Sequence, residues 1–183
     1  QGYGHLFALD DDSYAAVSGY GFVIQDMKIT NGYLWEGGGA ILIADAAGPL
    51  LLKNLTLGPS NYSREGGAVK IVNTSVTMEN VSIGQNTANT WNNGEVAQGG
   101  AIWISNTSSY SVEINNSTLK NNYSTGDGFN AHASGGAINI YGAGSLDVIN
   151  SEIVDNLTQV NDYGAHAEGG AIFADGAAQV TLV

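Results

Sequence analysis

The chain has 183 residues, 43% of them apolar, which is enough for one domain with a sizeable hydrophobic core. Seventeen acidic residues against five basic ones give a net charge of -12, which repels nucleic-acid phosphates and anionic membrane surfaces. The absence of cysteine excludes disulfides and thiolate metal sites, and no apolar run is long enough for a membrane-spanning helix.

A short motif of two glycines, an alanine and an aliphatic residue returns along the chain. Residues 4–7 (GHLF) are a degenerate first copy, and the second glycines of the complete copies are residues 39, 67, 100, 136 and 170. The apolar residues that follow alternate with other residues, as Ile102 and Ile104 do, which is the periodicity of a β-strand. Repetition at roughly 30 residues is typical of a solenoid.

A second apolar segment in each repeat has a polar residue near its centre. In chain order these segments are 24–29 (IQDMKI), 52–57 (LKNLTL), 78–83 (MENVSI), 114–119 (INNSTL) and 148–153 (VINSEI). Aligned without gaps, they place in one column Asp26, Asn54, Asn80, Asn116 and Asn150. Stacked side-chain amides hydrogen-bond from coil to coil, so we expect this column to be a structural ladder inside the coil.

Short strands at two or more places per repeat, joined by tight turns, predict a parallel β-helix. We expect an all-β, right-handed solenoid of about five to six coils that takes up residues 1–183 as a single segment. Glycine at a stacked corner avoids collisions between Cβ atoms and permits a positive φ. Because QGYGHLFAL and QVTLV carry no polar cap, we expect the segment to belong to a longer repeat protein or to stack end to end.

A further column lies six positions after the first, at Gly32, Ser60, Asn86, Asn122 and Asn156. Three of its members end the motifs 83–86 (IGQN), 119–122 (LKNN) and 153–156 (IVDN). Together with the glycine motif, they resemble the G-G-A-[ILV] and F-x-x-N repeats of polymorphic outer-membrane proteins and related bacterial autotransporter passengers and adhesins, with aliphatic residues in place of Phe. The resemblance implies a β-helix and an extracellular or cell-surface location.

Enzymes that degrade polysaccharides also use β-helices, and such a lyase or glycosidase is the alternative to a structural protein. A lyase of this kind needs clustered carboxylates for calcium and a Lys or Arg near the reacting sugar. The cations are dispersed without such a pattern, at Lys28, Lys53, Arg64, Lys70 and Lys120. The one acidic cluster, Asp10-Asp11-Asp12, is either a solvated turn or a calcium site. We therefore expect no catalytic residues and no cofactor.

Three loops of 13 residues, 86–98, 122–134 and 156–168, are expected to stack as one lobe because their lengths are equal. They place His132 and His166 in register, with Val96 one coil below. The two imidazoles are either a metal site or a stacked pair on the loop surface, and the valine favours the stacked pair.

Alternation along the glycine-led strands predicts a stripe of large apolar residues on the outer face. Its members are Phe7, Leu42, Trp103 and Phe173. An exposed apolar stripe usually marks a contact with a protein, a ligand or a covering loop, and Trp103 suits stacking on a sugar.

Asparagines in N-x-[ST] motifs are more frequent than this composition predicts. Those in the first column are assigned to the ladder and excluded as glycosylation sites. The remaining candidates are Asn61, Asn73, Asn106, Asn115, Asn122 and Asn156. We thus expect an extracellular structural or adhesive glycoprotein, a rod or filament unit that associates end to end and contacts a host or matrix glycan or protein.

Overall fold

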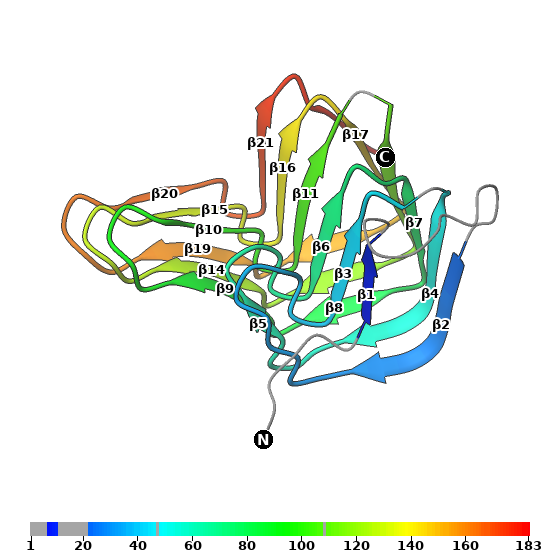
Figure 1. The fold of residues 1–183 in the computed structure, drawn as a ribbon, viewed down its shortest axis with the longest axis horizontal. Helices are drawn as coiled ribbons and strands as arrows, with labels where there is room; N and C mark the ends of the chain where they lie inside the picture. The colour runs from blue at the N-terminus through cyan, green and yellow to red at the C-terminus, as the bar shows by residue number, and fades with distance from the viewer. Residues whose placement is uncertain (1–6, 11–21, 47, 108) are drawn as a thin grey trace.

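The computed structural model describes residues 7–10, 22–46, 48–107 and 109–183. Within these ranges the chain is all β and contains no helix, and the paired strands are parallel. Figure 1 shows strands of successive repeats stacked as a solenoid, from which a lobe projects to one side. The parallel β-solenoid is confirmed, whereas its handedness and its number of coils stay predictions.

The glycine-led segments form the first sheet, which has six strands. In order across the sheet they are β1 (Phe7–Asp10), β3 (Ile41–Ala44), β6 (Val69–Val72), β11 (Ile102–Asn106), β16 (Ile138–Gly142) and β21 (Ile172–Gly176). Their inward positions fall into columns, one of which contains Ile41, Val69, Ile102 and Ile138. All four are fully buried, and burying each such side chain contributes about 1.5–3 kcal/mol.

The second sheet has nine strands and bends at the column that contains Asp26 and Asn54. The long strands β2 (Phe22–Ile29) and β4 (Leu50–Leu57) run through the bend, and later repeats divide there into two strands. These are β7 (Val76–Glu79), β8 (Ser82–Gly84), β12 (Ser111–Asn115), β13 (Thr118–Lys120), β17 (Ser145–Ile149), β18 (Glu152–Val154) and, beyond them, β22 (Gln179–Leu182). The core runs between this sheet and the first.

Two smaller sheets complete the fold, and most of their residues lie in the three equal loops. We define the lobe as residues 86–98, 122–134 and 156–168. One layer contains β5 (Tyr62–Ser63), β9 (Thr87–Thr90), β14 (Tyr123–Gly126) and β19 (Leu157–Val160), and the other contains β10 (Val96–Gln98), β15 (His132–Ser134) and β20 (His166–Glu168). The loops pair strand to strand, as their equal lengths predicted (Figure 1).

The two glycines of each repeat serve different purposes. In four of the five copies the first glycine has a positive φ, for example 65° at Gly99, which residues with a side chain rarely adopt. The second is crowded by the next coil, since a Cβ on Gly100 would lie 2.2 Å from the carbonyl oxygen of Gly136. The chain therefore needs glycine at both positions wherever the coils stack.

Candidate functional site

The column of Asp26, Asn54, Asn80, Asn116 and Asn150 is not inside the coil. All five residues are exposed, with φ between 47° and 58°, at the outer bend of the second sheet. Asparagine and aspartate tolerate this left-handed conformation, which explains the repeated residue type. Side-chain bonds join Asn54 to Asp26 (2.8 Å) and Asn80 to Asn54 (3.3 Å), but they lie in solvent. The prediction of an internal ladder at this column is therefore wrong.

The internal ladder belongs to the other asparagine column. Asn61, Asn86 and Asn122 are fully buried, and Asn156 is half-buried. Each Nδ2 donates to the Oδ1 of the next asparagine, at 2.9 Å from Asn61, 3.0 Å from Asn86 and 2.9 Å from Asn122. The same Nδ2 atoms also donate to backbone carbonyls, as Asn86 does to Leu57 at 3.0 Å. Asn61 takes the place predicted for Ser60, because the repeat contains one extra residue at Pro59.

Burial overturns several of the predicted glycosylation sites. Asn61, Asn122 and Asn106 are buried in the folded chain, and their Nδ2 atoms donate to protein acceptors. Asn156 is the fourth member of the buried ladder. No room exists there for an attached sugar. The prediction is untested at Asn73 and Asn115, which are half-buried and donate to Asp45 and Glu113.

The predicted apolar stripe is partly covered. Leu42, Trp103 and Phe173 share a register across the first sheet and are half-buried. Lys70 stands between Leu42 and Trp103, with its Nζ 4.9 Å from the centre of the Trp103 ring. The predicted stripe places Phe7 beside Leu42. In the structure Ala8 pairs with Leu42, whereas Phe7 pairs with Ile41, one residue earlier.

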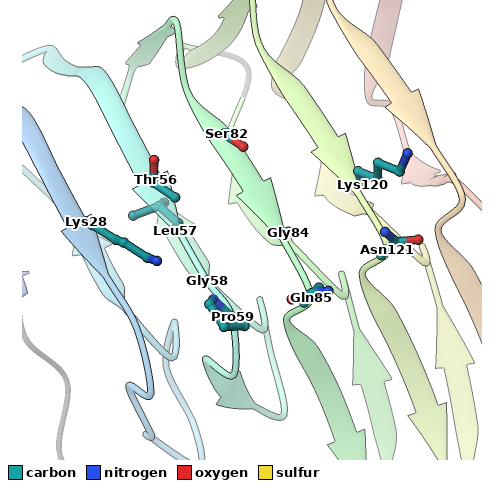
Figure 2. A pocket seen from close by; sticks show the side chains of 10 residues that line it. All are labelled: Lys28, Thr56, Leu57, Gly58, Pro59, Ser82, Gly84, Gln85, Lys120 and Asn121. Carbon is teal, nitrogen blue, oxygen red and sulfur yellow. The ribbon is translucent and has the colours of Figure 1, made fainter.

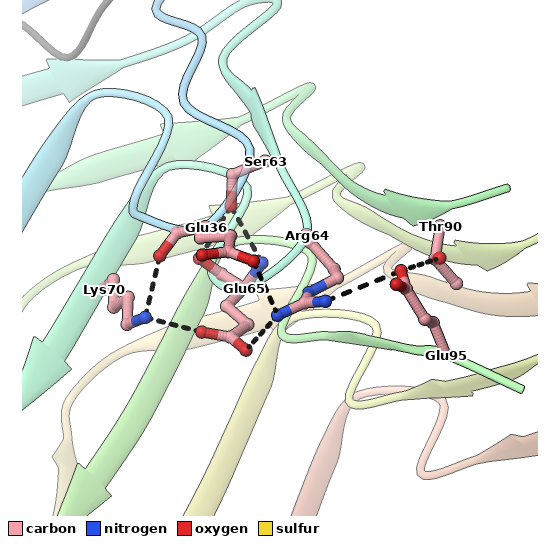
Figure 3. A network of polar contacts seen from close by, with 7 residues as sticks. All are labelled: Glu36, Ser63, Arg64, Glu65, Lys70, Thr90 and Glu95. Atoms are coloured by element: carbon pink, nitrogen blue, oxygen red, sulfur yellow. Dashed lines mark hydrogen bonds and ion pairs between the residues drawn. The ribbon is translucent and has the colours of Figure 1, made fainter. Parts of the chain in front are cut away.

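A network of charged side chains lies where the lobe meets the first sheet (Figure 3). Glu65 forms ion pairs with Lys70, at 2.6 Å, and with Arg64, at 3.2 Å. Arg64 also reaches Glu95 of the lobe at 3.5 Å and Glu36 at 3.7 Å. These contacts connect the lobe to the first sheet through residues that lie far apart in the sequence.

The chemistry of this network suits a brace better than a catalyst. Each of its three carboxylates is paired with a cation. Hydrogen bonds from Asn92 and Thr90, followed by the charge of Arg64, lower the pKa of Glu95 below its usual value. A general acid at neutral pH needs the opposite, a carboxyl whose pKa is raised. The lowered pKa thus argues against a general-acid role for Glu95 at neutral pH.

A shallow groove of about 270 Å³ lies on the outer face of the second sheet (Figure 2). Gly58 and Gly84 line it, and Lys28 and Lys120 stand beside it. The other lining residues are Thr56, Leu57, Pro59, Ser82, Gln85 and Asn121. Lys120 pairs with Asp155 at 3.5 Å, and Lys28 has no ion pair among the described residues. Most of the polar side chains around the groove are exposed, so it is a solvated hollow.

His132 and His166 stack as ring on ring, with centroids 5.1 Å apart, and Val96 pairs one coil below as predicted. The part of the chain that the structure describes contains no group of three or more His, Asp or Glu side chains arranged to hold a metal ion. Asp11 and Asp12 of the predicted acidic cluster lie outside the described residues.

Exposed aromatic rings gather on the lobe, a feature that the sequence analysis missed. They are Trp91, Tyr123, Phe129 and Tyr163. Phe129 and Tyr163 stack at the tip with centroids 6.4 Å apart, and Trp91 stacks on Trp35. Phe129 and Tyr163 occupy the same position in two of the equal loops, 34 residues apart, a signal that was available in the spacing. Trp91 and Tyr123 lie at other positions of the loops, so spacing does not mark them.

Comparison of the chain with protein-family models, with curated proteins and with solved structures finds no match. Within the described ranges no helix has the length and apolar character needed to cross a membrane.

Proposed function

We propose that this chain is a non-catalytic, extracellular adhesive or structural protein of a cell surface, in which a stiff solenoid displays the lobe as its contact surface. The observation that carries the proposal is the gathering of exposed aromatic rings on the lobe. Aromatic residues are enriched at the contact surfaces of proteins, and four of the exposed rings lie on this one lobe. The buried asparagine ladder and the charged brace support a rigid display.

The likeness of the repeats to those of polymorphic outer-membrane proteins and autotransporter adhesins also supports this function. The alternative, a polysaccharide-degrading enzyme, requires an acid or base that is free to act. In the charged network the described carboxylates are bound in ion pairs, which favours the adhesive function.

The test measures the retention under flow of beads coated with the purified chain, on immobilised polysaccharide and on extracellular-matrix protein. We expect attachment to at least one surface and its loss when Trp91→Ala, Phe129→Ala and Tyr163→Ala are combined. The matched control is Tyr141→Ala, an exposed ring on the first sheet outside the lobe, which should attach like the unaltered chain. No attachment, equal attachment of the lobe variant, or steady release of reducing or unsaturated sugar ends would contradict the proposal.

A further inference from the structure

Four aromatic side chains form a continuous stack at the side of the lobe. We call Tyr33, Trp35, Tyr62 and Trp91 the aromatic cluster. The ring centroids are 5.5 Å apart for Tyr33 and Tyr62, 5.6 Å for Tyr62 and Trp91, and 5.4 Å for Trp35 and Trp91. All three pairs are within 20° of parallel. Stacking on two rings fixes the orientation of Trp91, yet this residue remains 54% exposed.

Polar side chains continue the same face beyond Trp91. Trp91, Asp127 and Asn161 directly follow β9, β14 and β19, which are neighbouring parallel strands. Asp127 accepts hydrogen bonds from Asn161 at 2.6 Å and from Asn89 at 3.2 Å. An exposed indole is therefore followed, one strand at a time, by a carboxylate and an amide whose positions are fixed by hydrogen bonds.

Two buried polar atoms, one in the cluster and one beside it, lack hydrogen-bond partners. Neither the hydroxyl of Tyr62 nor Oδ1 of Asn89 has a hydrogen bond of good geometry, although the two side chains are close to each other. Burial raises the pKa of Tyr62 well above its usual value, and Asn89 offsets part of the rise. The hydroxyl therefore keeps its proton and stays a hydrogen-bond donor. Unsatisfied buried groups are rare in native proteins and mark places where a further polar partner would be favourable.

The chemistry of this face selects among ligand classes. A pyranose ring offers an apolar C–H face to an indole and hydroxyl groups to amides and carboxylates around it. Asp127 and the net charge of -12 disfavour uronates and sulfated glycans. A stable protein interface needs about 800 Å² per partner around an apolar centre, whereas Trp91 is bordered by Asn92, Asn93 and Asp127. We infer that the aromatic cluster, with Asp127 and Asn161, binds a neutral polysaccharide, an inference that rests on the proposed function and names its ligand class.

The test is isothermal titration of the full chain with soluble neutral polysaccharides, a mannan, a β-glucan and a xylan, beside polygalacturonate. We expect binding to at least one neutral polymer, with Trp91→Ala weakening it about tenfold or more. Trp91→Phe, which keeps a ring on the stack, should lose less. The matched control is Tyr141→Ala, which removes an exposed ring on the first sheet, outside the lobe, and should leave the affinity unchanged. Melting temperatures of all variants verify the fold.

Three results would overturn the inference. They are no binding of any neutral polymer by the unaltered chain, equal affinity after Trp91→Ala, and tighter binding of polygalacturonate than of the neutral polymers. If these occur while beads still attach to matrix protein through the lobe, the proposed function stands and its ligand at that surface is a protein. If the lobe variant of the bead assay attaches normally, the proposed function fails as well.

Discussion

Asparagine has two different roles in this chain, and backbone geometry decides between them. Asn80 stands at an exposed bend with a φ of 55°, where its short side chain tolerates the left-handed conformation. Asn86 is fully buried, and its amide both donates to and accepts from the neighbouring coils. Replacing Asn80 removes an exposed contact, whereas replacing Asn86 interrupts the internal ladder.

We predict that Asn86→Leu lowers the free energy of unfolding by about 3 kcal/mol or more. It leaves the backbone N–H and the Nδ2 of Asn61 without their acceptor, and each unsatisfied buried group costs about 1–3 kcal/mol. Asn80→Gly, which suits the positive φ, should cost less than about 1 kcal/mol. Urea unfolding of both variants measures the difference, and equal losses would contradict the assignment of the internal ladder to the Asn86 column.

The two asparagine columns were predictable as columns but not in their roles. Both contain asparagine at a regular spacing, so periodicity alone does not separate a bend from a buried ladder. Asp26 was the available signal, because a carboxylate has no Nδ2 donor with which to continue an amide ladder. The extra residue Pro59 kept Asn61 from being recognised as a member of the buried column. A gapless alignment across Pro59 puts Ser60 in the column instead of Asn61.

Ion pairs of equal length differ in how far water reaches them. The pairs Lys70–Glu65 and Lys53–Glu79 have the same separation of 2.6 Å. The side chains of the first pair are 15% and 16% exposed, and both side chains of the second are 37% exposed. Water therefore screens the second pair far more strongly than the first.

We predict that Lys70→Met lowers the free energy of unfolding by about 3 kcal/mol, because it leaves Glu65 largely buried with only Arg64 as a partner. Lys53→Met, the matched change in the exposed pair, should cost at most about 1 kcal/mol. The free energies come from urea unfolding at neutral pH. A loss at Lys53 as large as that at Lys70 would mean that burial does not govern the strength of these pairs.

At the scale of the elements, the second glycine of each repeat sets how closely the coils approach. Gly39, Gly67, Gly100 and Gly136 all face the carbonyl oxygen of the glycine in the next coil, and a Cβ there would lie within 2.4 Å of it. Gly170 belongs to the same sequence column but has no atom within 4 Å of an added Cβ in this chain. One column thus supplies both a sensitive position and its control.

We predict that Gly100→Ala destabilises the fold by at least about 2 kcal/mol, because the added methyl group forces two coils apart. Gly170→Ala should leave stability within about 0.5 kcal/mol of the unaltered chain. Thermal melts of the two variants make the comparison. If Gly100→Ala melts at the temperature of Gly170→Ala, the coils are not packed as closely as the structure has them.

The sequence allowed the first sheet and the lobe to be predicted because their residues recur in register. The alternation after the glycine motif marked the inward columns, and equal loop lengths marked the stacking of the lobe. Phe7 escaped the pattern because the first motif is degenerate, so its register was assigned by motif position alone. Cover of the stripe by Lys70 was not predictable either, since it depends on how a long side chain crosses to the neighbouring strand.

At the scale of the whole molecule, a stiff solenoid carries a lateral lobe (Figure 1). Trp91, Phe129 and Tyr163 of this lobe are exposed to solvent. The asparagine ladder and the charged network hold the lobe in a fixed position relative to the first sheet, which reduces the entropy lost on binding. The aromatic cluster unites Tyr33, Trp35, Tyr62 and Trp91 from separate segments, and only the fold reveals that they meet.

Hydroxyl-radical footprinting tests the central claim, that the lobe is the contact surface, most directly because aromatic side chains oxidise in proportion to their exposure. The chain is labelled free and while bound to a neutral polysaccharide, and oxidation of Trp91 is expressed relative to Tyr141 on the first sheet. We predict that this ratio falls on binding while Phe22, which is exposed on β2, stays unchanged relative to Tyr141. An unchanged ratio at Trp91, or protection of Tyr141 or Phe22 instead, would contradict the account.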